Sequence, residues 1–196
     1  MHGLRRMATA AIGGALAGGG VYLGLVTGAV PIDLGLGRRL RALGPLSVEI
    51  DAPAEEVFDV LAEPYAVRTS RAVQEKVRVL ERGQDMVLAA HYTPIRGRLR
   101  ATTVETVRFQ RPHQIDFRLV RGPVPYVVET FTLEQVGDQT LLTYTGQLGT
   151  DLWRLGERWG DVVSPKWESV VASAFGATKN EAERRHAARR HARREA

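Results

Sequence analysis

From Lys76 to Gly149, apolar and polar side chains alternate, and this long run constrains the fold more than any other feature. Alternation with a period of two is typical of β-strands that bury one face. Turn residues divide the run into six predicted strands, over residues 76–82, 86–93, 98–110, 114–120, 126–136 and 139–149. Because the connections are short, we expect consecutive strands to pair antiparallel.

A short strand and a helix are predicted before this run. Residues 46–50 alternate as a strand, and Asp51 can then cap a helix whose first turn contains Pro53. Two glutamates follow at the positive end of the helix dipole, and Pro64 ends the helix. A second short helix or turn is expected over residues 65–73.

A long helix is predicted after the strands. We expect Asp151 to cap it and Pro165 to kink it. One face of this helix is apolar and is expected to pack on the sheet. The residues of that face are Leu152, Leu155, Trp159, Val163, Trp167, Val170, Val171, Ala174 and Thr178.

Three segments carry a resemblance to a known family: SVEIDAPAEEVFDVL over 47–61, VETFTLE over 128–134, and the tryptophan-bearing last helix. Over residues 46–180 the chain resembles the START-like (SRPBCC) superfamily, and within it the bacterial polyketide cyclase/dehydrase and lipid-transport group, in a membrane-anchored form. The resemblance implies an α+β helix-grip fold, in which a seven-stranded antiparallel sheet wraps on a long C-terminal helix. The superfamily includes carriers, cyclases, coenzyme-Q binders and interaction modules, so it implies the fold more specifically than the function.

The amino terminus predicts one transmembrane helix before this domain. The 24 residues from Met7 to Val30 carry no charge, and about 20 such residues span a bilayer. Gly20, Gly24 and Gly28 fall at the small-residue spacing that lets membrane helices pack closely. The alternatives are a signal peptide cleaved after Ala29 and a soluble leader.

We therefore expect residues 1–30 to be a membrane anchor and residues 31–45 to be a tether. The implied location is the cell membrane, with a single pass. Arginines flank the uncharged run on both sides, so the positive-inside rule does not choose the side on which the domain lies.

The positive charge of the chain lies at its two ends. The first 45 residues and the last 18 each carry a net charge of +4, out of +5 for the whole chain, so residues 46–178 are mildly acidic. The basic tail over 181–196 is interpreted either as a solvated helix end or as a segment that attracts anionic phospholipid headgroups. Nucleic acid is not an expected partner, because the body has no basic face with interleaved aromatic residues. The arginines of the tail are Arg184, Arg185, Arg189, Arg190, Arg193 and Arg194.

The parity of the predicted strands selects candidates for a ligand cavity between the sheet and the last helix. Glu105 and Glu129 share the parity of their apolar neighbours and are expected to point inward, where a carboxylate is costly unless it is paired or hydrated. A strand bulge that shifts the parity is the competing explanation. The other inward candidates are Phe117, Phe131, Tyr144, Trp167 and one of the adjacent pair His91 and Tyr92.

No recognised catalytic motif is present, and there is no cysteine. Glu105 and Glu129 are expected two strands apart with an offset of two residues, roughly 12 Å between backbones, which disfavours a shared-proton pair. His186 and His191 are spaced off one helical face, so no metal site and no cofactor is expected.

The leading functional hypothesis is a membrane-tethered carrier or sensor of a hydrophobic small molecule, such as a lipid, quinone or polyketide-like compound. The second is a cyclase or dehydratase, in which an inward glutamate or histidine removes a proton next to a carbonyl group. The third is an interaction module without a ligand. The sequence leaves the ligand and the oligomeric state open.

Overall fold

The computed structural model describes residue 20 and residues 22–30, 33–96 and 98–195. Seven strands form one antiparallel sheet in the order β1-β7-β6-β5-β4-β3-β2. The strands are β1 (Arg39–Ile50), β2 (Val77–Arg82), β3 (Met86–Arg96), β4 (Leu99–Gln110), β5 (Gln114–Arg121), β6 (Tyr126–Val136) and β7 (Gln139–Thr150). The predicted run of hairpins is confirmed, and the first strand pairs with the last.

The first strand begins seven residues earlier than predicted, because residues 39–45 belong to β1 and not to the expected tether. Arg39 pairs with Thr150, and the register shifts between Leu43 and Leu46. The Gly44-Pro45 pair, which indicates a loop in the sequence, occupies this bulge. An edge strand such as β1 tolerates a proline and a bulge, because its outer hydrogen-bonding side has no partner strand.

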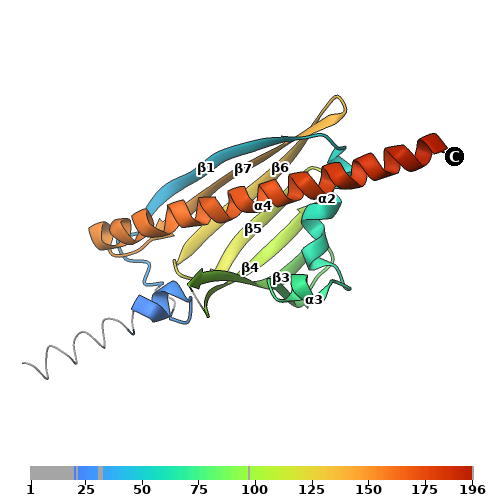
Figure 1. Cartoon of the computed structure of the whole chain (residues 1–196). Helices are drawn as coiled ribbons and strands as arrows, with labels where there is room; N and C mark the ends of the chain where they lie inside the picture. Colours follow the sequence, from blue (N-terminus) through green and yellow to red (C-terminus); the bar gives the residue numbers. More distant parts are fainter. Residues whose placement is uncertain (1–19, 21, 31–32, 97, 196) are drawn as a thin grey trace, which may run out of the picture.

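The helices are α2 (Ala54–Ala62), the 3-10 turn η1 (Glu63–Tyr65), α3 (Arg71–Gln74) and α4 (Trp153–Glu195). Pro53, rather than Asp51, is the N-cap of α2, and the Gln135 side-chain oxygen accepts from the Ala54 N–H of the first turn at 2.7 Å. In Figure 1 the long helix α4 lies across one face of the sheet, and α2 lies beside its second half. The hydrophobic core lies between the helices and the sheet.

The buried side of α4 follows Val163, Val171, Phe175, Thr178 and Ala182. Three residues of the predicted apolar face, Leu155, Val170 and Ala174, are exposed instead. Leu155 precedes the part of the helix that packs on the core. Val170 and Ala174 each precede a residue of the buried stripe by one position, which turns them toward solvent. The helix continues through Pro165 to Glu195 without a break at residue 180.

Asp151 does not cap α4 as predicted. Its carboxylate accepts hydrogen bonds from the backbone N–H of Leu34 at 2.7 Å and of Gly35 at 2.8 Å, and from Arg38 Nε at 2.7 Å. These bonds lower the pKa of Asp151, with the Arg38 guanidinium as the largest cause. The carboxylate therefore fastens the chain before β1 to the start of α4.

The predicted anchor lies for the most part outside the described residues. Within the part of the chain that the structure describes, no helix is long and apolar enough to cross a membrane. Residues 22–26 are helical, but the helix ends before Gly28, whose φ is +70°. Gly20, Gly24 and Gly28 therefore do not share one helical face, because a left-handed residue ends an α-helix.

Residues 22–30 contact the domain. The Thr102 N–H on β4 donates to the Thr27 carbonyl oxygen at 2.9 Å. The Tyr22 ring meets the edge of Trp159 on α4, with centroids 6.0 Å apart. A Cβ at Gly28 would lie 2.4 Å from the Thr102 carbonyl oxygen, so this close approach requires glycine.

Candidate functional site

Both predicted carboxylates lie inside the molecule, on the face of the sheet covered by α4. Glu105 on β4 is 6% exposed and Glu129 on β6 is 7% exposed. Glu105 pairs with Leu119 of the strand between them, and Glu129 pairs with Phe117 of the same strand. The offset of two residues is therefore as predicted, and no bulge turns either glutamate toward solvent.

Glu129 contacts two other predicted residues. The Trp167 Nε1–H, from α4, donates a hydrogen bond of 2.6 Å to Glu129 Oε1. The Tyr144 side chain on β7 is fully buried beside Glu129, and its hydroxyl lowers the pKa of Glu129. That hydroxyl has no partner with hydrogen-bond geometry in the described part of the chain. A buried hydroxyl without a partner is costly, and a ligand group or a water would satisfy it.

Glu105 belongs to a second chain of contacts. Its Oε2 lies 3.2 Å from His91 Nδ1, and His91 Nε2 is 2.9 Å from the Tyr65 hydroxyl. His91 is thus the inward member of its pair. Tyr92, its neighbour on β3, belongs to the opposite face and is not brought to the site.

The pKa values of the two glutamates are shifted in opposite directions. Burial raises the pKa of Glu129 to about 7, and the nearby charge of Glu105 adds to this effect. Burial also acts on Glu105, but His91 outweighs it and lowers the pKa of Glu105 below its usual range. One carboxyl is therefore close to half-protonated at neutral pH, and the other is ionised. This is the environment that separates an acid from a base in enzyme sites.

Tyr65 joins these two chains of contacts electrostatically. Burial raises its pKa, and the charges of Glu105 and Glu129 raise it further. Tyr65 was not among the predicted site residues. It follows the proline that ends α2, and no local pattern links it to a histidine 26 residues away in the sequence.

Aromatic rings form the apolar wall beside the glutamates. The centroid of the Phe131 ring lies 4.8 Å from that of Phe117, 5.8 Å from that of Tyr144 and 5.1 Å from that of Phe175. Phe117 and Phe131 are thus brought together as predicted. Phe175 completes the group from α4.

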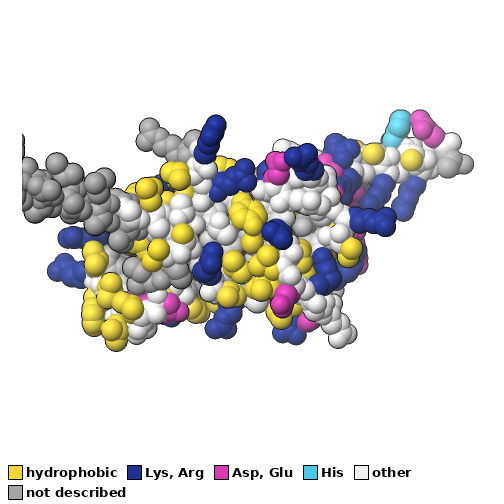
Figure 2. Space-filling view, turned by 90° about the horizontal axis from the view of Figure 1, so that it is seen from below, with side chains coloured by type: hydrophobic (Ala, Val, Ile, Leu, Met, Phe, Trp, Pro, Cys, Tyr) yellow, Lys and Arg dark blue, Asp and Glu magenta, His cyan; other side chains and the backbone are white. Residues whose placement is uncertain are grey.

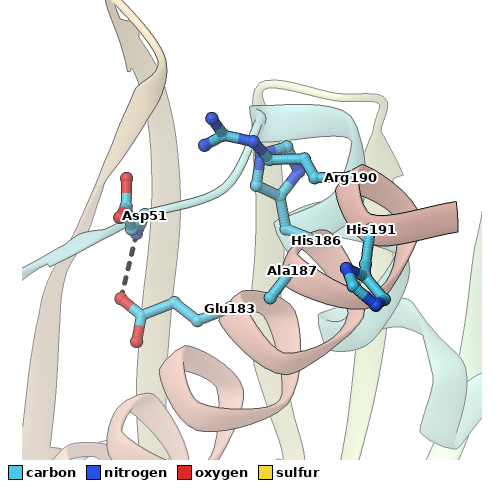
Figure 3. Close-up of a pocket in the computed structure, with 6 residues that line it drawn as sticks. All are labelled: Asp51, Glu183, His186, Ala187, Arg190 and His191. Carbon is cyan, nitrogen blue, oxygen red and sulfur yellow. Dashed lines mark hydrogen bonds between the residues drawn. The ribbon is translucent and has the colours of Figure 1, made fainter. Parts of the chain in front are cut away.

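Two hollows are open at the surface. One, of about 340 Å³, is lined by Asp59, Ala62, Glu63, Tyr65, Ala66, Arg82 and Phe109. Tyr65 is the side chain that this hollow shares with the buried cluster. The other, of about 470 Å³, lies where the second half of α4 passes the end of β1 (Figure 3). It is lined by Asp51, Glu183, His186, Ala187, Arg190 and His191.

The tail arginines are not part of the buried cluster, and several pair within the domain. Arg185 binds Glu63 at 2.6 Å, and Arg184 binds Glu181 at 2.7 Å. Arg189 Nε lies 3.5 Å from the buried Glu56, which also lies 3.2 Å from His186. The described residues contain no group of three or more side chains that could hold a metal ion.

Comparison with known proteins identifies the family. The model of the polyketide cyclase/dehydrase and lipid transport family matches residues 46–190, most of the chain. The chain belongs to this family. Its match includes part of the basic tail, in keeping with the unbroken helix α4.

Solved structures share the fold of this family member. The aromatase/cyclase ZhuI from Streptomyces sp. R1128 is 22% identical, with a TM-score of 0.56, over 76% of this chain and 95% of that chain. Norcoclaurine synthase from Thalictrum flavum, in complex with dopamine and hydroxybenzaldehyde, is 12% identical with a TM-score of 0.55, over 76% and 90%. The di-domain aromatase/cyclase BexL of the BE-7585A pathway is 13% identical with a TM-score of 0.53, over 76% and 50%. No curated protein matches the sequence.

Proposed function

We propose that this protein binds a hydrophobic small molecule that carries carbonyl or hydroxyl groups, such as a lipid, a quinone or a polyketide-like compound, between α4 and the sheet. We propose further that residues 1–30 hold it at a membrane. The observation that carries the binding proposal is the buried group of Glu129, Tyr144 and Trp167 beside an aromatic wall. An apolar wall with a few inward polar groups is the usual composition of a small-molecule site.

The chemistry of the buried polar groups defines the ligand class. The Tyr144 hydroxyl has no partner with hydrogen-bond geometry among the described residues, and it can donate to a carbonyl oxygen. Glu129, with a pKa near 7, can donate when protonated and accept when ionised. The aromatic rings favour an apolar or aromatic body over a sugar or a nucleotide. The membership of the family, which includes lipid transport, agrees with such a ligand.

The tether is supported by the sequence. The uncharged run from Met7 to Val30 has the length of a bilayer span, eight residues separate it from β1, and its last residues, 22–30, contact the domain. A binding domain held beside a lipid phase meets apolar ligands at a far higher local concentration than a domain free in water.

A second function, acid–base catalysis of the cyclase or dehydratase type, is favoured by the pKa of Glu129. A carboxyl that titrates near the working pH is well matched to remove or supply a proton. In this scheme ionised Glu129 removes a proton next to a carbonyl group, while the Tyr144 hydroxyl polarises the carbonyl oxygen. Protonated Glu129 then supplies a proton to a departing hydroxyl, which leaves as water.

Extraction of the purified full-length protein with organic solvent, followed by mass spectrometry, tests the proposal. We expect one reproducible apolar compound in the wild-type extract. Tyr144→Phe keeps the ring and removes the buried hydroxyl, so it should lower the amount retained by about tenfold, the effect of one lost buried hydrogen bond. Tyr92→Phe makes the same change on the other face of the sheet and should retain as much as the wild type.

The extracts also separate the functions. If Glu129→Gln retains a compound heavier by one water than the wild-type compound, the protein is a dehydratase. The same compound in both indicates binding without turnover. An empty wild-type extract would contradict the binding proposal and favour an interaction module.

A further inference from the structure

Exposed apolar side chains gather at one end of this molecule. Figure 2 shows hydrophobic side chains at the left, the end at which α4 begins in Figure 1. We call this the apolar end and define it by Leu34, Leu36, Leu40, Val120, Trp153 and Leu155. These six side chains are between 54% and 66% exposed. Five more exposed apolar residues lie close by, in residues 22–30 and in the β3–β4 hairpin.

Backbone hydrogen bonds hold the segment before β1 against the start of α4, so the side chains of the apolar end are exposed on an ordered backbone. The Leu152 N–H donates to the Leu36 carbonyl at 2.8 Å, and the Trp153 N–H donates to the Gly37 carbonyl at 3.1 Å. The Arg38–Asp151 pair lies directly behind them. A surface that exposes more than half of each of six large apolar side chains is typical of an interaction site.

Exposed arginines lie next to these apolar residues in the chain. Arg100 on β4, Arg121 at the end of β5, and Arg154 and Arg158 on α4 all have exposed side chains. Exposed apolar side chains with neighbouring arginines fit the interface of a bilayer that contains anionic lipid, because the apolar side chains can enter the acyl region while the arginines meet the headgroups.

The described part of the uncharged run contacts the domain at this same end. Residues 22–30, the last part of the uncharged run that begins at Met7, contact β4 and α4 there. The basic tail lies at the other end of α4 (Figure 1). Since 43 residues of α-helix span about 65 Å, the tail and the apolar end are separate surfaces.

We propose that the apolar end is a membrane-docking surface, which inserts its leucine, valine and tryptophan side chains into the interface of an anionic phospholipid bilayer. This inference rests on the membrane tether of the proposed function. It replaces the basic tail as the surface that orients the domain, and it places the start of α4 and the β5–β6 loop against the lipid.

Site-specific labelling of the full-length protein tests this proposal, because the sequence contains no cysteine. Single cysteines at Leu155 and Val120 report on the apolar end, and single cysteines at Val67 and Val136 report on exposed apolar positions elsewhere. Each carries an environment-sensitive nitrobenzoxadiazole label. The protein is reconstituted in vesicles of phosphatidylcholine with phosphatidylglycerol, with and without lipid that has a nitroxide quencher on its acyl chain.

We expect the nitroxide lipid to quench the labels at Leu155 and Val120 several-fold more than those at Val67 and Val136. Reversal of charge in Arg121→Glu/Arg154→Glu should reduce this quenching. The matched reversal in Arg190→Glu/Arg193→Glu, at the tail, should leave it unchanged. A tail that orients the domain would give the opposite pattern and overturn the proposal.

Flotation of the same vesicles separates the two hypotheses. Protein that floats without quenching at Leu155 and Val120 overturns the docking surface and leaves the tether standing. Protein that does not float overturns both. Emission at Leu155 that shifts to the blue with protein concentration, and needs no lipid, assigns the surface to a second copy of the chain and also overturns the proposal.

Discussion

At the scale of single residues, the environment of each carboxyl decides its charge. Glu105 and Glu129 have the same chemistry and almost the same burial. His91 lies 3.2 Å from Glu105 and lowers the pKa of Glu105, whereas Glu129 receives the neutral Trp167 N–H and the repulsion of the Glu105 charge. The position of His91 beside Glu105, and not beside Glu129, therefore decides which of the two carboxyls is ionised at neutral pH.

Glu129→Gln should stabilise the protein as the pH rises. Below about pH 4.5 the carboxyl is protonated in both folded and unfolded wild type, so it contributes no pH dependence. Because the pKa in the folded state is about 7, ionisation favours the unfolded chain as the pH rises between these values. The variant should gain up to about 3 kcal/mol over wild type by pH 8.

Urea unfolding at several pH values measures this difference. Glu134→Gln, on the exposed side of the same strand, is the control and should show a flat difference. A flat difference for Glu129→Gln as well would mean that Glu129 is ionised in the folded protein throughout this range.

At the scale of elements, α4 has two tasks. Its middle part covers the sheet and supplies Trp167 to Glu129, and its last part contacts α2 through His186 and Arg189, which face Glu56. The Glu183 carboxylate also accepts from the Asp51 N–H at 3.0 Å, which joins the helix to the end of β1.

Trp167→Phe should raise the pKa of Glu129 further, by about one unit. The indole N–H stabilises the ionised carboxylate, and phenylalanine keeps much of the packing but has no donor. Carbon-13 NMR of the glutamate carboxyl groups measures the pKa. Trp153→Phe, at the exposed start of the helix, should leave it unchanged, and an unchanged value in Trp167→Phe would show that the hydrogen bond has no effect.

Removal of residues 181–196 should destabilise the domain by about 2 kcal/mol, because it removes buried packing together with partly buried ion pairs. Ala182 is fully buried, and His186 and Arg189 face the buried Glu56. A chain that ends after residue 190 keeps these groups and should lose less than about 0.5 kcal/mol. Thermal unfolding of the two chains measures the effect, and equal melting temperatures would restore a domain boundary near residue 180.

At the scale of the whole molecule, the two ends of α4 face different surroundings. The start of the helix lies beside residues 22–30, the last part of the uncharged run, and its last part lies beside α2, where His186 and Arg189 face Glu56. A polar cluster is enclosed between helix and sheet. The molecule is thus organised along α4, with one end proposed to meet the membrane.

The full-length protein should remain in the membrane fraction after a carbonate wash. Such a wash releases proteins held by charge and retains those held by an apolar span. A charge in the middle of the run, Leu16→Arg, should release a large part of the protein, whereas Leu16→Val should not. Release of the wild type would contradict the anchor, and a mature chain that begins near Val30 would indicate a cleaved signal peptide instead.

The sequence by itself determined the strands, their antiparallel order and the inward direction of both glutamates. These follow from period-two alternation and short turns, which are local properties, so the two-residue offset between Glu105 and Glu129 could be predicted, whereas the register shift between Val104 and Glu105 could not. The start of β1 could not, because the bulge at Gly44-Pro45 has the composition of a loop and is held by pairing with β7, about 100 residues later. Only the tertiary structure shows that Tyr65 contacts His91, that Trp167 donates to Glu129 and that Asp151 binds residues 34–38, which precede β1. Each of these is a contact between elements far apart in the sequence, whose partners are chosen by packing and not by local pattern.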